Sequence, residues 1–215
     1  MLRILKKFQY NAPVILTYAL ISGIALVLSL LTSNLSNHYV FSVYRSPLTD
    51  PLTYPRLIMH VFGHVDFNHY LSNFLIILLV GPMLEEKYGS VKMLVMILIT
   101  ALVTGGAFLA VSGGNTALLG ASGVAFMMIL LSSFVNLKKG RIPLTVILVI
   151  ILYLGKEAVS GFTATDNISH ITHIIGGVCG ALLGFALNRK YALIKKRDSV
   201  DPPLEGDSDL IEKAR

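Results

Sequence analysis

Long uninterrupted runs of apolar residues are the feature that most constrains this chain. A helix that crosses the roughly 30 Å hydrocarbon core of a bilayer needs about 20 such residues. Six segments meet or approach that length: 14–31, 70–84, 93–111, 117–135, 142–158 and 168–187. Only 14% of the 215 residues are charged, against about a quarter in soluble globular proteins. The sequence therefore predicts an all-α polytopic membrane protein, a bundle of six transmembrane helices.

The basic residues indicate how these segments are oriented. If the N-terminus lies inside, all but three of the 18 Lys and Arg residues fall in the inner connections. The exceptions are Arg45, Arg56 and Lys156. Cytoplasmic loops carry such an excess of Lys and Arg, so we expect both termini in the cytoplasm. The net charge of +6 arises from basic clusters that lie between apolar runs. We therefore expect the chain to interact with the lipid bilayer and not with a nucleic acid.

The chain divides into three parts on this basis. Residues 1–13 form a cytoplasmic N-terminus, and residues 14–187 form one membrane domain with a long outer loop at 33–69. That loop is apolar enough to pack against or dip into the outer leaflet. Residues 188–215 are predicted to be a cytoplasmic tail that is disordered, because its composition is too polar to pack. The single cysteine, Cys179, excludes an internal disulfide framework and reads as a small buried residue.

A few polar side chains lie inside the apolar segments, where they are costly and usually functional. His69 and Asn73 are four residues apart at the start of the second predicted helix, Ser122 lies early in the fourth, and His170 and His173 lie early in the sixth. All three segments are predicted to run inward from the outer face. At 1.5 Å rise per residue these groups share one depth, within roughly 10 Å of the outer end.

Ser122 and His173 together suit acyl transfer. A serine hydroxyl becomes a good nucleophile when an adjacent base removes its proton, and histidine is the usual base. No carboxylate lies within the apolar segments near His173, and Asp166 reads as a loop residue. We therefore expect a Ser–His dyad, with the ring of Phe126 stacked on the imidazole. His69, Asn73 and the backbone N–H of Ser122 would supply oxyanion donors.

A ladder of small residues predicts which helices touch. Gly176, Gly180 and Gly184 recur at every fourth position after His173, and Ala121 and Ala125 have the same spacing. Small residues at this spacing allow close backbone approach between membrane helices. The pattern favours contact between the fourth and sixth segments, which would bring Ser122 to His173.

These residues resemble the motifs of the rhomboid family of intramembrane serine proteases, of the bacterial type with a six-helix core. Four short motifs carry the resemblance, in this order along the chain: His64-x4-His69-x3-Asn73, Gly81-x3-Glu85-x3-Gly89, Gly120-x-Ser122-Gly123 and His173-x2-Gly176-x3-Gly180. The resemblance implies that Ser122 is the nucleophile and His173 the general base. It assigns oxyanion stabilisation to His69, Asn73 and the Gly120 position. It assigns structural roles to Arg56, Glu85, Gly123, Phe126, Gly176 and Gly180.

The resemblance also implies a function and a location. The chain is expected to be a serine endopeptidase of the plasma membrane that cleaves single-span or polytopic membrane proteins near the extracytoplasmic face. Neither an organic cofactor nor a metal is implied, and the sequence does not indicate an oligomeric state. A catalytically inactive rhomboid-like protein that binds membrane proteins is the main alternative.

Two further alternatives depend on histidines. His60 and His64 have the spacing of a zinc protease motif, although Val61 stands where that motif has its catalytic Glu. His69 and His173 could instead serve as axial haem ligands, which would leave the motif around Ser122 unexplained. We expect His60 and His64 to be structural hydrogen-bonding groups, and His38 to be a solvated loop residue.

Overall fold

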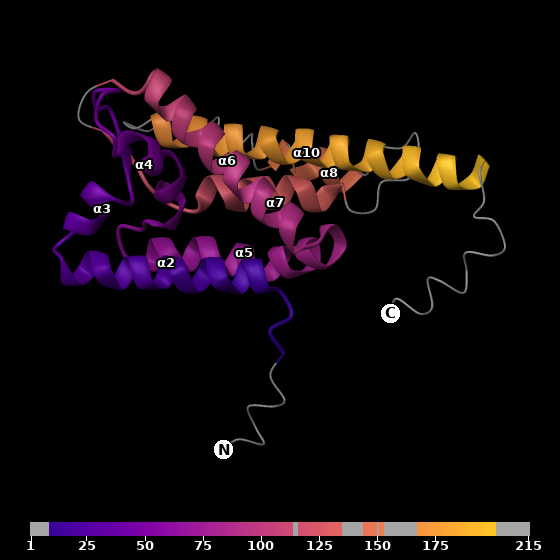
Figure 1. Ribbon diagram of the computed structural model, residues 1–215, viewed down its shortest axis with the longest axis horizontal. Coiled ribbons are helices and arrows are strands. Elements are labelled where there is room, and N and C mark those ends of the chain that lie inside the picture. The colour runs from indigo at the N-terminus through magenta and orange to yellow at the C-terminus, as the bar shows by residue number, and fades with distance from the viewer. Residues whose placement is uncertain (1–8, 114–115, 135–143, 150, 153–166, 201–215) are drawn as a thin grey trace, which may run out of the picture.

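The computed structural model describes residues 9–113, 116–134, 144–149, 151–152 and 167–200, and it is mostly helical (Figure 1). Three helices are long and apolar enough to cross a membrane: α2 (Pro13–Leu31), α5 (Phe67–Tyr88) and α6 (Ser90–Val111). Two shorter apolar helical stretches are α7 (Ser122–Ser133) and residues Ile171–Leu187 of α10 (Asn167–Val200). These elements support the predicted helical membrane bundle.

The predicted boundaries differ from the observed ones in the second half of the chain. The fourth segment was predicted to be helical from residue 117, but α7 begins at Ser122. Residues Ala117–Leu118 form strand β2 instead, which pairs antiparallel with β1 (Val43–Tyr44). Gly120 has φ +129°, a conformation that suits glycine and not a helix. The helix therefore starts immediately after this turn.

Helices α8 (Leu144–Val149) and α10 (Asn167–Val200) correspond to the fifth and sixth predicted segments. Helix α8 lies in the predicted fifth segment, of which residues 142–143, 150 and 153–158 lie outside the described part. Helix α10 continues to Val200, beyond residue 187 where the membrane domain was predicted to end. Residues 188–200 include three Lys and two Arg, which are good helix formers, and contain neither Gly nor Pro. The remainder of the predicted tail, 201–215, is not described.

The outer loop folds around the buried side chain of Arg56. The loop contains α3 (Leu35–Tyr39), β1, α4 (Thr53–Met59) and the 3-10 helix η1 (His60–Phe62). The Arg56 guanidinium donates to the carbonyl of Tyr39 and to the carboxylate of Asp50, each at 3.0 Å, and lies 4.5 Å from the centre of the Tyr44 ring. These contacts fit the structural role expected of Arg56.

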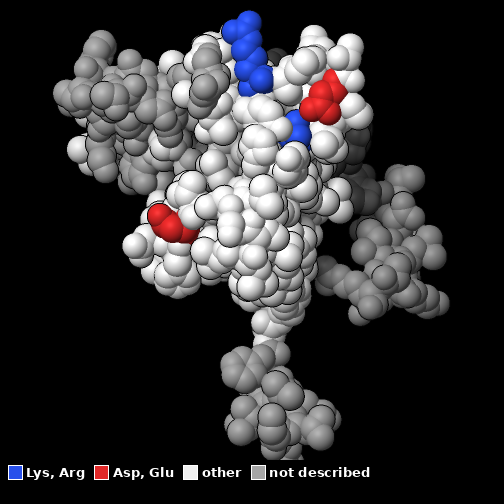
Figure 2. All heavy atoms as spheres, turned by 90° about the vertical axis from the view of Figure 1, so that its left-hand side faces the viewer, with Lys and Arg blue, Asp and Glu red and all other residues white. Residues whose placement is uncertain are grey.

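The outside of this loop is largely uncharged. Figure 2 views the end of the molecule that carries α3 and α4, where few charged side chains are visible. Seven large apolar side chains of the loop are exposed: Leu35, Tyr39, Val40, Leu48, Leu52, Tyr54 and Val65. Such a surface suits contact with apolar lipid; that the loop meets the outer leaflet stays a prediction.

Glu85 joins the start of α2 to the end of α5. Its buried carboxylate accepts hydrogen bonds from the backbone N–H groups of Val14 and Ile15, each at 3.0 Å. These donors belong to the first turn of α2, which has no partner for them within its own helix. Close by, the side chain of Ile15 packs against Gly81, where a Cβ atom would come within 2.7 Å. Both contacts fit the structural role expected of Glu85.

His60 and His64 are buried where the outer loop meets the helices. His60 is 1% exposed and His64 is completely buried. Burial disfavours the charged imidazolium, and it lowers the pKa of His60 to about 3 and the pKa of His64 to about 4. Both side chains are therefore neutral at physiological pH, and their partners are polar groups of the fold.

Replacing Glu85 with Ala should lower the thermal unfolding temperature in detergent. The change leaves two buried N–H groups of α2 without an acceptor. Each unsatisfied group lowers the free energy of unfolding by about 1–3 kcal/mol. Glu86→Ala is the matched control, because Glu86 is the neighbouring residue and its side chain is exposed. Equal unfolding temperatures for the two variants would contradict the role of Glu85.

Acid should destabilise the folded protein through His64. Between about pH 6.5 and pH 4 the unfolded chain binds a proton at His64 that the folded chain does not bind. The free energy of unfolding should then fall by about 1.4 kcal/mol per pH unit from this group. We expect His64→Gln, which cannot titrate there, to show a shallower fall between pH 7 and pH 5. Identical slopes for the variant and the wild type would be the contrary result.

Candidate active site

Ser122 and His173 meet between α7 and α10. Ser122 is the first residue of α7, and His173 lies two turns into α10. The Oγ of Ser122 and the Nε2 of His173 are 2.8 Å apart, although the residues are 51 positions apart in the sequence. Both side chains are partly exposed. A hydroxyl and an imidazole at this distance can exchange a proton along a hydrogen bond.

Glycines of α10 make this meeting possible. A Cβ atom on Gly176 would overlap the backbone carbonyl of Gly123, and a Cβ atom on Gly180 would overlap the carbonyl of Met127. The two backbones are therefore in direct contact along one side of each helix. Contact between the fourth and sixth segments was predicted, but the partners on α7 are the backbones of Gly123 and Met127, where Ala121 and Ala125 were expected.

Phe126 holds the plane of the His173 ring. The two ring centroids are 4.8 Å apart and the planes are inclined by 10°. Phe126 lies one turn after Ser122 on α7 and is buried. The predicted stacking is confirmed, and it orients the imidazole by packing against an aromatic face.

His69 and Asn73 approach the same site from α5. Asp66 caps this helix by accepting a hydrogen bond from the backbone N–H of His69 at 2.7 Å. The His69 ring lies against Gly120, where a Cβ atom would come within 2.8 Å of Cε1 and 3.7 Å of the Asn73 Nδ2. Gly120 is two residues before Ser122. Three parts of the chain that were predicted to share one depth thus converge in space.

Gly120 contributes space to the site. Its backbone N–H donates to the carbonyl of His60 at 2.9 Å, so this donor is already used. The absence of a side chain, however, leaves room for the ring of His69 beside the turn into α7. A positive φ and a close neighbour together explain why glycine suits this position.

His64 links the outer loop to both sides of the site. Its Nε2 lies 3.2 Å from the Nδ2 of Asn73 and 3.4 Å from the backbone N of Ala121, while its Nδ1 lies 3.2 Å from the carbonyl of Phe62. Two N–H groups can donate to Nε2 only if the proton of the neutral ring is on Nδ1. The expectation of a structural hydrogen-bonding role agrees with these contacts, but no sequence signal indicated Asn73 and Ala121 as the partners.

The remaining histidines are placed as follows. The Nε2 of His60 lies 3.4 Å from the Thr104 hydroxyl, so His60 and His64 have different partners and do not converge on one point. Within the described ranges, no cluster of three or more His, Cys, Asp or Glu residues could hold a metal ion. His38 stacks on the ring of Tyr44. Asp166, and the side chain of His170, lie outside what the structure describes.

A protein-family model matches more than half of the chain. Residues 51–190 match the model of the Rhomboid domain. A comparison with curated proteins finds no match. The matched segment is more than half of the chain, and it contains every residue of the site from His64 to His173. The chain therefore belongs to the rhomboid family of membrane proteins.

Proposed function

We propose that this protein is an intramembrane serine endopeptidase, with Ser122 as nucleophile and His173 as general base. The observation that carries the proposal is the 2.8 Å contact between Ser122 Oγ and His173 Nε2. In this contact the neutral imidazole accepts the hydroxyl proton at Nε2, and its own proton is then on Nδ1. The stacked ring of Phe126 orients the base where a classical triad would use a carboxylate.

The reaction begins when Ser122 Oγ attacks the scissile carbonyl and His173 takes its proton. The carbonyl oxygen becomes negatively charged and needs donors that are already in position. The candidates are the backbone N–H of Ser122 at the positive end of α7, together with the side chains of His69 and Asn73. His173 then gives its proton to the leaving amine, which leaves an acyl-enzyme on Ser122.

The second half of the reaction is hydrolysis of the acyl-enzyme, in which water takes the place of the serine hydroxyl in the proton transfers. His173 removes a proton from a water molecule, and the resulting hydroxide attacks the acyl-enzyme. Collapse of this intermediate returns the proton to Ser122 Oγ and releases the new carboxyl end of the substrate. Ser122, His173 and His69 are each partly exposed, which supports access of water to the site.

Within this proposal His64 is a positioning residue for Asn73. It accepts one N–H of the Asn73 amide and the N–H of Ala121, so it fixes a side chain of α5 relative to the residue before the nucleophile. One further N–H of the Asn73 amide is then directed elsewhere, and an oxyanion beside Gly120 is the partner that we propose for it. A preorganised donor of this kind needs no rearrangement when charge develops.

The proposed substrates are membrane-spanning proteins cut near the outer face of the plasma membrane. In this arrangement residues 14–187 form the protease domain, both termini are cytoplasmic, and the site faces the extracytoplasmic side. A helical peptide bond is shielded by its own hydrogen bonds, so the substrate must unwind locally. Helix-destabilising residues near the outer end of a substrate should therefore favour cleavage.

Replacing Ser122 or His173 with Ala should abolish cleavage of a single-span substrate by the purified protein in detergent. Each change removes one partner of the proton transfer. The Ser122→Ala variant should also lose labelling by a serine-reactive fluorophosphonate. Ser133→Ala is the matched control, because Ser133 is the last residue of the same helix and its hydroxyl donates to the carbonyl of Ile129, at 3.4 Å.

Two results would contradict the assignment. Turnover retained by a folded Ser122→Ala protein would exclude Ser122 as nucleophile. A wild-type protein that neither cleaves nor labels, under conditions where active family members do both, would favour the alternative of an inactive rhomboid-like protein that binds membrane proteins.

Replacing Asn73 with Ala should lower kcat by about 10- to 1000-fold without abolishing turnover, as loss of a single oxyanion donor does. Asn68→Ala is the matched control, because Asn68 is exposed on the first turn of the same helix. Thermal unfolding of both variants shows whether the fold is retained. Wild-type kcat in a folded Asn73→Ala protein would rule out the proposed role.

A further inference from the structure

Tyr70 links α5 to α2, and these two helices lie side by side (Figure 1). Its hydroxyl donates to the backbone carbonyl of Ala19, a buried residue of α2, at 3.0 Å. A carbonyl oxygen has two lone pairs, so it can accept this bond in addition to one within its own helix. The hydroxyl lies beside Gly23, where a Cβ atom would be 3.4 Å from it. The ring of Tyr70 is therefore held in place by a helix other than its own.

The same ring packs on the imidazole of His64. The ring centroids are 5.5 Å apart and the planes are inclined by 85°, an edge-to-face arrangement that aromatic pairs favour. His69 and Phe74, on the same helix as Tyr70, also contact this imidazole, with centroids at 5.0 Å and 5.7 Å. Three rings of α5 thus surround His64, and the one from Tyr70 is also bonded to α2.

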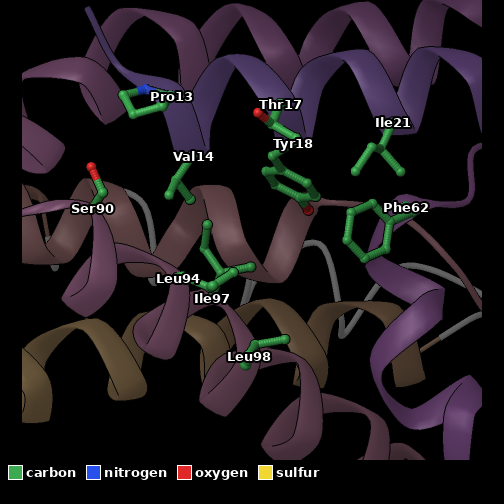
Figure 3. A pocket seen from close by; sticks show the side chains of 10 residues that line it. All are labelled: Pro13, Val14, Thr17, Tyr18, Ile21, Phe62, Ser90, Leu94, Ile97 and Leu98. Carbon is green, nitrogen blue, oxygen red and sulfur yellow. The ribbon is translucent and has the colours of Figure 1, made fainter.

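A second tyrosine connects α2 to His64 through the backbone of the outer loop. Tyr18 donates to the carbonyl of Val61 at 2.9 Å, and its ring lies beside that of Phe62 in the wall of a pocket between α2 and α6 (Figure 3). The carbonyl of Phe62 is in turn 3.2 Å from the Nδ1 of His64. Helix α2 therefore reaches His64 by two routes, through the ring of Tyr70 and through the backbone of residues 61–62.

We propose that Tyr70 is a positioning residue for the active site and that it acts through His64. Tyr70 is one of the three positions between His69 and Asn73 to which the motif assigns no role. The proposal rests on the proposed function, because the group that is positioned in the end is the oxyanion donor Asn73.

The contacts of His64 explain how Tyr70 would act at a distance. The Nε2 of His64 lies 3.2 Å from the Asn73 amide nitrogen and 3.4 Å from the backbone N of Ala121. Movement of the imidazole would displace both the proposed donor and the turn before Ser122. The Tyr70 hydroxyl fixes the ring against which the imidazole rests. Without that bond, the donor would spend less time in the geometry that stabilises the oxyanion.

The variant Tyr70→Phe tests this role, because it removes the hydroxyl and keeps the ring. We expect kcat for a single-span substrate in detergent to fall about 2- to 10-fold, the factor that corresponds to one neutral hydrogen bond. KM should not change, since the donor acts on the transition state. Tyr10→Phe is the matched control, because it also removes a tyrosine hydroxyl bonded to α2, at 2.8 Å from Thr17, but from an exposed ring.

A double-mutant cycle separates positioning from a general structural effect. In an Asn73→Ala protein the proposed donor is already absent, so Tyr70→Phe should lower kcat no further. A residue that only stabilised the fold would lower kcat by the same factor in both backgrounds.

Nuclear magnetic resonance of protein with isotope-labelled histidine follows the same link without requiring activity. The ring signals of His64 are identified by their loss in His64→Gln. We expect Tyr70→Phe to shift or broaden them, and Tyr10→Phe to leave them in place.

Two results would overturn the proposal: wild-type kcat in Tyr70→Phe, or an equal loss of kcat with and without Asn73. A wild-type protein without Ser122-dependent cleavage would instead refute the proposed function. In that case unchanged His64 signals in Tyr70→Phe would overturn the link from Tyr70 to His64, and displaced signals would support it.

Discussion

Direct backbone contact between α7 and α10 is the constraint on which the candidate site depends. Gly176 and Gly180 let the carbonyls of Gly123 and Met127 into the surface of α10. At ordinary helix separations of 8–10 Å, a short serine side chain and an imidazole would have to bridge a wider gap. The contact instead brings Oγ and Nε2 to 2.8 Å at one end of the same interface. Any side chain at these glycines would push apart the two helices that carry Ser122 and His173.

The outer loop holds parts of this site in place through hydrogen bonds. Its segment from His60 to His64 reaches three other parts of the chain: the carbonyl of His60 holds Gly120, and the ring of His64 holds Asn73 and Ala121. Arg56 in turn ties the loop together through Tyr39, Asp50 and Tyr44. Hydrogen bonds between buried groups of this kind hold their side chains in a single arrangement. A change in the loop would therefore affect the turn before Ser122 without touching the nucleophile.

Phe62 connects this segment of the outer loop to α2. Its ring packs edge-to-face on Tyr18, whose hydroxyl donates to the carbonyl of Val61 at 2.9 Å. Its neighbours His60 and His64 hold the turn before α7. Contacts between α2 and η1 therefore also reach the turn before Ser122.

The sequence by itself determined the helical membrane class, the family, and the set of polar residues worth following. These depend on composition, helical spacing and short motifs, which are local properties of the chain. The stack of Phe126 on His173 could also be predicted, since it follows from one helical turn after Ser122. Only the tertiary structure decided that α7 begins at Ser122, that Gly176 and Gly180 face backbone carbonyls, and that the N–H of Gly120 is already used. The partners of His64 likewise could not be read from the sequence. Ala121 is 57 residues away from it, and hydrogen-bond partners at such separations are set by how the helices pack.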